Sequence, residues 1–217
     1  MKTGMPKKRV IKGLYAITPD ELDTAELLRK VRLALQGGAR VLQYRNKAAD
    51  TELRLQQARA LRQLTREFDA TFIVNDDAQL AAQVDADGVH LGGEDGSVAA
   101  ARALLGKQKI IGVSCYNRAP LAFEAVRQGA DYVAFGAFFS ASVKPEAVQA
   151  DVALLQAMRH ELNVPIVAIG GITAQNGAVL IAAGADALAV ISALWNAADT
   201  RIAAQEFSNL FEQGNQA

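Results

Sequence analysis

Cysteine is almost absent from this chain, since Cys115 is the only one in 217 residues. A lone cysteine cannot form an internal disulfide, and it excludes a metal site built on paired cysteines. Such low usage is typical of a reducing compartment, so we expect a cytoplasmic protein. A chain of this length can bury enough surface to fold without a disulfide or a structural metal.

An excess of charge is also absent, because 23 Lys and Arg residues balance 23 Asp and Glu residues. Domains that bind nucleic acid are typically basic, so we expect no nucleic-acid partner. Residues 1–12 are locally basic and are predicted to form a solvated, mobile tail. No apolar stretch approaches the roughly 18 residues of a membrane span, so we expect no membrane partner.

Short apolar runs alternate with longer helix-like stretches along the chain, without a Pro-, Gly- or Ser-rich linker. The runs are rich in Val, Ile and Phe, which is typical of parallel strands covered on both faces. The eight runs are Gly13–Thr18, Arg40–Arg45, Thr71–Asp76, Gly88–Gly92, Ile110–Cys115, Tyr132–Phe138, Pro165–Gly170 and Leu188–Ser192. Eight strand–helix units predict an α/β protein with one domain, a (β/α)8 TIM barrel over residues 13–217.

Similar short motifs recur where a helix is expected to end and a strand to begin. Three of them contain Gly-Ala, at Gly38, Gly129 and Gly184, and a fourth begins at Asp85. Glycine suits the left-handed position that follows a helix. We therefore predict that these motifs are helix-to-strand turns of the barrel.

Cationic side chains follow the second apolar run. In a barrel the active site lies at the C-terminal ends of the strands. The second strand is predicted to end in Gln43-Tyr44-Arg45-Asn46-Lys47, and Gln43, Arg45 and Lys47 then share one face because side chains alternate along a strand. Two cations and an amide suit a pyrophosphate group. The alternative is a surface charge cluster paired with nearby acids.

Carboxylates follow the third and fourth runs. Magnesium takes one or two carboxylates and completes its coordination with water and phosphate oxygens. We assign Asp76 and Asp95 to a magnesium ion, and we predict that Asp77 caps the following helix. His90, inside the fourth run, is expected to be a packed or hydrogen-bonded core residue without a chemical role.

Glycines and small polar residues end the last two runs. Many barrels bind phosphate on backbone NH groups after strands seven and eight. Gly171 lets the backbone approach a phosphate oxygen, and Ile191 and Ser192 end the eighth run. Lys144, after the sixth run, is either a further cation for the leaving group or an exposed loop lysine.

An ordered set of motifs covers the chain from residue 13 to about 211. They are Leu14-Tyr15-Ala16-Ile17-Thr18, Gln43-x-Arg45-x-Lys47, Asn75-Asp76, Asp87-Gly88-Val89-His90-Leu91-Gly92, Gly112-Val113-Ser114, Ala168-Ile169-Gly170-Gly171-Ile172 and Val190-Ile191-Ser192. Together they resemble the thiamine phosphate synthase family. The resemblance implies an enzyme that joins a pyrimidine diphosphate to a thiazole phosphate and releases pyrophosphate.

The resemblance also implies roles for individual residues and Mg²⁺ as cofactor. The residues implied to bind the aminopyrimidine diphosphate are Gln43, Arg45, Lys47, Asn75, Ser114 and Lys144. The catalytic candidates are Arg45, Lys47, Ser114 and Lys144. Asp76 and Asp95 would hold magnesium, and Gly171, Ile191 and Ser192 would bind the thiazole phosphate. In this family the pyrophosphate leaves first, and the thiazole nitrogen attacks the resulting cation.

One loop departs from the family pattern. The family usually has Thr-x-Thr-Lys after strand six, where this chain has Ala141-Ser142-Val143-Lys144. Contacts from this loop to the thiazole phosphate would then fall to Ser140, Ser142 or the backbone. Two alternatives stay open: a related barrel such as a thiazole tautomerase, or, because of this altered loop, an inactive barrel that binds a phosphorylated metabolite. The partners expected are two small phosphorylated substrates, and no oligomeric state is indicated.

Overall fold

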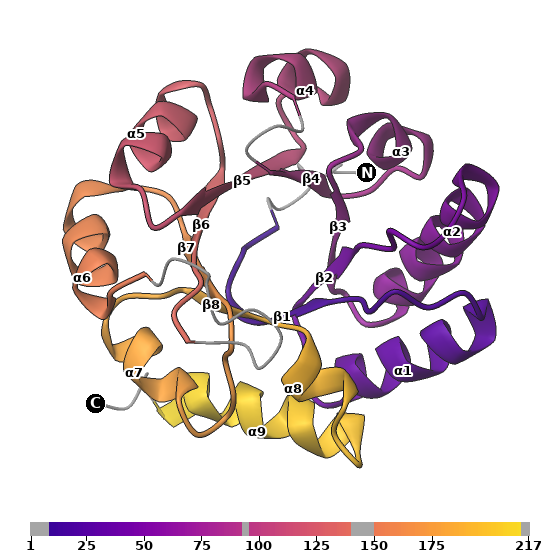
Figure 1. Cartoon of the computed structure of the whole chain (residues 1–217). Coiled ribbons are helices and arrows are strands. Elements are labelled where there is room, and N and C mark those ends of the chain that lie inside the picture. Colours follow the sequence, from indigo (N-terminus) through magenta and orange to yellow (C-terminus); the bar gives the residue numbers. More distant parts are fainter. Residues whose placement is uncertain (1–8, 93–95, 140–149, 214–217) are drawn as a thin grey trace, which may run out of the picture.

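The computed structural model describes residues 9–92, 96–139 and 150–213. Eight parallel strands pair in chain order and close into a barrel, which helices surround (Figure 1). The strands are β1 (Gly13–Ile17), β2 (Val41–Tyr44), β3 (Thr71–Asn75), β4 (Gly88–Leu91), β5 (Ile110–Tyr116), β6 (Tyr132–Phe135), β7 (Ile166–Ile169) and β8 (Ala187–Val190). The predicted (β/α)8 barrel is therefore confirmed.

The helices follow the strands around the outside of the barrel. They are α1 (Thr24–Gln36), α2 (Thr51–Glu67), α3 (Ala78–Gln83), α4 (Val98–Leu105), α5 (Ala119–Arg127), α6 (Val152–Glu161), α7 (Gly177–Ala182), α8 (Ser192–Trp195) and α9 (Thr200–Gln213). The predicted helix-to-strand turns are confirmed, because Gly38, Asp85, Gly129 and Gly184 all have positive φ angles. Helix α9 closes the ring beside α1 (Figure 1).

Several strands end earlier than predicted. The sixth apolar run extends to Phe138, but β6 ends at Phe135. Gly136 follows it, and a Cβ atom there would lie 2.3 Å from the carbonyl oxygen of Ile169. Phe138 is nonetheless only 5% exposed. A buried apolar loop therefore continues the sequence pattern of the strand that precedes it.

Side chains on the strands form two separate hydrophobic clusters. Leu42, Phe72 and Ile111 belong to the larger cluster between the barrel and its helices. Tyr15 and Tyr132 belong to the smaller cluster inside the barrel. This alternation between two buried environments explains why the strands read as continuous apolar runs.

The inner cluster also contains a residue from the predicted N-terminal tail. Ile11 is 3% exposed and packs with the inward-facing side chains of the strands. Arg9 forms an ion pair with Asp69, on the loop before β3. The packed chain therefore begins before Gly13, and the predicted boundary at residue 12 falls within it.

Gly112 on β5 makes space for a large ring inside the barrel. It pairs with His90 of β4 on one side and with Tyr132 of β6 on the other. A Cβ atom on Gly112 would lie 1.9 Å from Cζ of Tyr132. The Tyr132 ring therefore occupies the space above Gly112 and stacks on His90, with ring centroids 5.5 Å apart.

This packing predicts that Gly112→Ala lowers the free energy of unfolding by about 3 kcal/mol, at the upper end of overpacking costs. The clash is with the Tyr132 ring, so Gly112→Ala should cost less than about 1 kcal/mol in a Tyr132→Leu background. Urea unfolding of the two single variants and the double variant measures this difference. An equal loss in both backgrounds would show that the ring does not set the requirement for glycine.

Candidate functional site

A cavity of about 720 Å³ lies at the C-terminal ends of β2 and β3. Its lining includes four of the residues predicted to bind substrate or metal, which are Arg45, Lys47, Asn75 and Asp76. Cations and a carboxylate thus share one cavity at the barrel rim. This is the end of the barrel at which enzymes of this fold carry their active sites.

The two cations lie on a loop, because β2 ends one residue before Arg45. The expectation that Gln43, Arg45 and Lys47 share one strand face was therefore wrong. Backbone contacts hold the loop: the Arg45 amide donates to Thr18 Oγ1 (2.8 Å), and that hydroxyl donates to the Arg45 carbonyl oxygen (2.7 Å). The Lys47 amide donates to Asp20 Oδ1 at 2.7 Å. The segment after β1 thus positions both cations.

The two adjacent aspartates after β3 differ in their surroundings. Asp76 has a φ angle of +63°, its amide donates to the His90 carbonyl oxygen (2.8 Å), and its Oδ2 accepts from Asn75 Nδ2 (2.6 Å). Asp77 Oδ1 instead accepts from the Leu80 amide at 2.8 Å and caps α3. The predicted cap is confirmed. Both aspartates line the cavity, and Asp76 is the one whose carboxylate accepts from Asn75.

Gln43 and Ser114 face the barrel interior. Gln43 is 3% exposed, and its Nε2 donates to the Tyr15 hydroxyl at 2.8 Å. Ser114 Oγ lies 2.9 Å from Nε2 of His90. His90 is therefore a hydrogen-bonded core residue, as predicted. Its contact with a candidate substrate-binding residue was missed, because no local pattern joins two strands.

Sequence reasoning also missed Arg54, a third cation in the lining of the cavity. It lies among the polar residues of a helix, where sequence alone does not distinguish a solvent-exposed side chain from one that lines a cavity. Its Nε is buried and has no hydrogen-bond partner among the described residues, and its Nη2 lies 3.5 Å from Thr51 Oγ1. Because α2 begins at Thr51, Arg54 lies in the first turn after the cationic loop. That closeness to Lys47 in the sequence was the available signal.

The residues predicted to bind the thiazole phosphate lie at the ends of the adjacent strands β7 and β8. Gly171 has a φ angle of +63°, and a Cβ atom there would lie 2.5 Å from the Phe139 carbonyl oxygen. Only glycine fits this position without strain. Ile191, 36% exposed, follows β8, and Ser192 begins α8.

Three predicted site residues, Asp95, Ser142 and Lys144, lie outside the described residues. In the described ranges, no three His, Cys, Asp or Glu side chains gather into a possible metal site. The predicted magnesium pair thus has one described member, Asp76.

None of the helices in these described ranges combines the length and the apolar character that crossing a membrane requires.

The single cysteine is not placed for nucleophilic catalysis. Cys115 is fully buried, and this burial raises the pKa of its thiol to about 12. The thiol therefore stays protonated at neutral pH, whereas a nucleophilic cysteine acts as the thiolate. The charged groups of the rim cavity are left as the candidates for the chemistry.

A closed barrel with polar side chains gathered at the C-terminal strand ends defines the class of (β/α)8-barrel enzymes. Residues 14–194 match the family model described as thiamine monophosphate synthase, and the chain belongs to that family. Thiamine-phosphate synthase from Methylobacillus flagellatus is 58% identical over 201 residues, which cover 93% of this chain and 96% of that protein.

A second relative and one solved structure support the same family. Thiamine-phosphate synthase from Nitrosospira multiformis is 52% identical over 206 residues, which cover 95% of this chain and 88% of that protein. The solved structure of thiamine phosphate pyrophosphorylase from Pyrococcus furiosus has a TM-score of 0.84 and 39% identity to this chain. That match covers 93% of this chain and 96% of the solved one.

Proposed function

We propose that the protein is a transferase of thiamine biosynthesis. It joins 4-amino-2-methyl-5-(diphosphooxymethyl)pyrimidine to a thiazole phosphate and forms thiamine phosphate and pyrophosphate. One observation carries the proposal: a chain of the thiamine monophosphate synthase family gathers Arg45, Lys47, Asn75 and Asp76 in one cavity at the barrel rim. The substrates are thus two small phosphorylated molecules.

Arg45 and Lys47 bind the diphosphate in this proposal. The bond between the pyrimidine methylene carbon and the diphosphate oxygen breaks, and the electron pair leaves with the diphosphate. Charge develops on the departing oxygens, and two fixed cations stabilise it. The backbone hydrogen bonds to Thr18 and Asp20 hold the loop in place before the substrate binds.

Gln43 and Ser114 bind the pyrimidine in the barrel mouth. An amide offers one donor and one acceptor side by side, which matches a ring nitrogen next to an amino group. Ser114 adds a hydroxyl from the opposite side of the interior, on β5. Together they orient the methylene carbon toward the incoming thiazole nitrogen, which forms the new C–N bond.

The thiazole phosphate binds at the ends of β7 and β8. The backbone at Gly171 approaches the phosphate closely, with Ile191 and Ser192 completing the site. Ser142 and Lys144, outside the described residues, are the candidates for contacts from the loop after β6. The two substrates then meet across the mouth of the barrel.

Asp76 and Asp95 would hold the magnesium ion. Magnesium in proteins is commonly held by one or two carboxylates. Asp76 lines the same cavity as Arg45 and Lys47, so the position of its carboxylate fits such a site. When bound, the ion neutralises part of the charge on the diphosphate. The low cysteine usage of the chain, with Cys115 alone, fits action in the reducing cytoplasm.

The proposal predicts equimolar pyrophosphate and thiamine phosphate from the two substrates and Mg²⁺, and no product after a chelator is added. Asp76→Asn should raise the Mg²⁺ concentration needed for half-maximal rate about tenfold or more. Asp77→Asn is the matched control, because Asn also caps helices, and it should leave this concentration nearly unchanged. Thiazole isomerisation without pyrophosphate would indicate a tautomerase, and phosphate binding without turnover would indicate an inactive barrel.

Loss of either loop cation should lower turnover about a hundredfold, the scale expected when one preorganised charge donor is removed. Steady-state rates of Arg45→Ala and Lys47→Ala test this, and the KM for thiazole phosphate should change little. Arg59 and Lys107 are exposed, so Arg59→Ala and Lys107→Ala serve as matched controls with near-normal rates. Near-normal turnover in both loop variants would remove the diphosphate assignment.

A further inference from the structure

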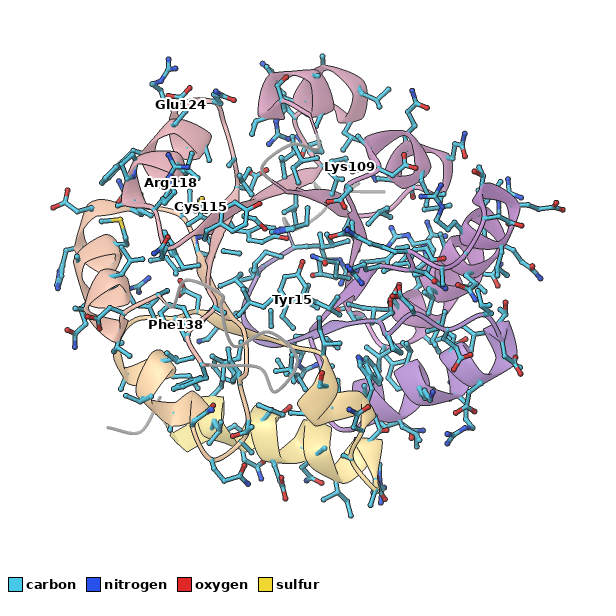
Figure 2. All side chains as sticks on the ribbon, in the orientation of Figure 1. Tyr15, Lys109, Cys115, Arg118, Glu124 and Phe138 are labelled. Carbon is cyan, nitrogen blue, oxygen red and sulfur yellow. The ribbon has the colours of Figure 1, made fainter. Side chains whose placement is uncertain are left out.

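A continuous chain of hydrogen bonds crosses the barrel interior from Gln43 to Ser114. Gln43 Nε2 donates to Tyr15 Oη (2.8 Å), and Tyr15 Oη lies 2.8 Å from Tyr132 Oη. Tyr132 Oη lies 2.9 Å from His90 Nδ1, and His90 Nε2 lies 2.9 Å from Ser114 Oγ. Figure 2 shows Tyr15 in the middle of the barrel, between the strands that carry the two ends.

We propose that Tyr15, Tyr132 and His90 are positioning residues for the pyrimidine. Through this chain they set which hydrogen-bonding groups Gln43 and Ser114 present to the substrate. The inference rests on the proposed function for the identity of the substrate. The order of protons along this hydrogen-bond chain is assigned from one end, where the Gln43 amide donates to Tyr15.

Each phenol in the chain has a single proton to donate. Burial raises the pKa of both Tyr15 and Tyr132 well above the usual value, so both stay neutral. Tyr15 accepts from Gln43, so we assign its own proton to the contact with Tyr132 and the Tyr132 proton to the contact with Nδ1 of His90. Neutral His90 then carries its proton on Nε2 and donates it to Ser114 Oγ.

This order leaves the substrate-facing groups fixed at both ends. Ser114 accepts from His90, so its own proton is available for the pyrimidine. Gln43 uses one N–H on Tyr15, which leaves an N–H and the carbonyl oxygen as a donor–acceptor pair. The reverse order would turn the Gln43 oxygen to Tyr15 and leave no acceptor for the pyrimidine amino group.

The hydroxyl groups are not needed to fill the interior. Phenylalanine would occupy nearly the same volume as Tyr15 and Tyr132, which are 1% and 0% exposed. Buried hydroxyls are costly unless they are hydrogen-bonded, and here they bond to one another and to the two ends of the chain. Gly112 gives the Tyr132 ring the space it needs to reach His90.

The first test follows the protons directly and needs no activity. The protein has two histidines, so ¹⁵N-histidine labelling gives two sets of ring signals. Exposed His160 is an internal reference. We expect His90 as a single neutral tautomer with its proton on Nε2. Tyr132→Phe should abolish that preference. Tyr44 is a buried tyrosine that takes no part in the hydrogen-bond chain, so Tyr44→Phe should leave the His90 signals unchanged. A proton on Nδ1 in the unmodified protein would overturn the inference.

The second test asks whether the chain acts as one unit. Tyr15→Phe and Tyr132→Phe should each lower kcat/KM for the pyrimidine diphosphate about tenfold, the scale of one hydrogen bond, and leave the KM for thiazole phosphate within about twofold. The kcat/KM of the double variant should be no lower than that of either single variant, because one substitution already interrupts the hydrogen-bond chain. Additive losses, or equal losses for both substrates, would indicate a structural role and overturn the proposal. If the unmodified protein formed no product while His90 kept its tautomer, the proposed function would fail and the proton order would stand.

Discussion

Eight parallel strands close into a barrel, and this closure decides where the other features of the molecule lie. Closure directs every second side chain into the narrow interior of the barrel, and it brings all the C-terminal strand ends to one rim. The rim brings Arg45 and Lys47, on the loop after β2, into one cavity with Asp76, which follows β3. The interior forces His90 and Tyr132 into contact across Gly112. Both the cavity and the hydrogen-bond chain are consequences of one closed sheet.

The barrel interior changes character along its axis. Ile11 and Ile110 contribute only apolar surface to the inner cluster. Toward the C-terminal ends of the strands, Gln43 and Ser114 add polar groups, which hydrogen-bond to Tyr15 and His90. Burying these groups is tolerable because hydrogen bonds satisfy them, and a low dielectric strengthens such bonds. In the proposed function, the same interior contributes packing at one end and orientation of the substrate at the other.

Local patterns predicted the barrel and much of the rim, because the residues that specify a parallel strand or a helix cap lie close together in the sequence. The cap at Asp77 is one example. The strand ends were less predictable, since the loop residue Phe138 is buried like a strand residue. The contact between Tyr15 and Tyr132 joins residues 117 positions apart, so no local pattern indicates it. Arg54 was missed because a polar helix face and a cavity wall look alike in sequence.

In the proposed function, the rim cavity holds the diphosphate on Arg45 and Lys47, with the metal on Asp76 beside it. The sharpest test is a crystal structure with Mn²⁺ in place of Mg²⁺ and with pyrophosphate, because the anomalous signal locates the metal. We expect a metal peak at the Asp76 carboxylate, and pyrophosphate oxygens within hydrogen-bonding distance of both cations. Pyrophosphate bound elsewhere on the barrel, or a metal away from Asp76, would contradict it.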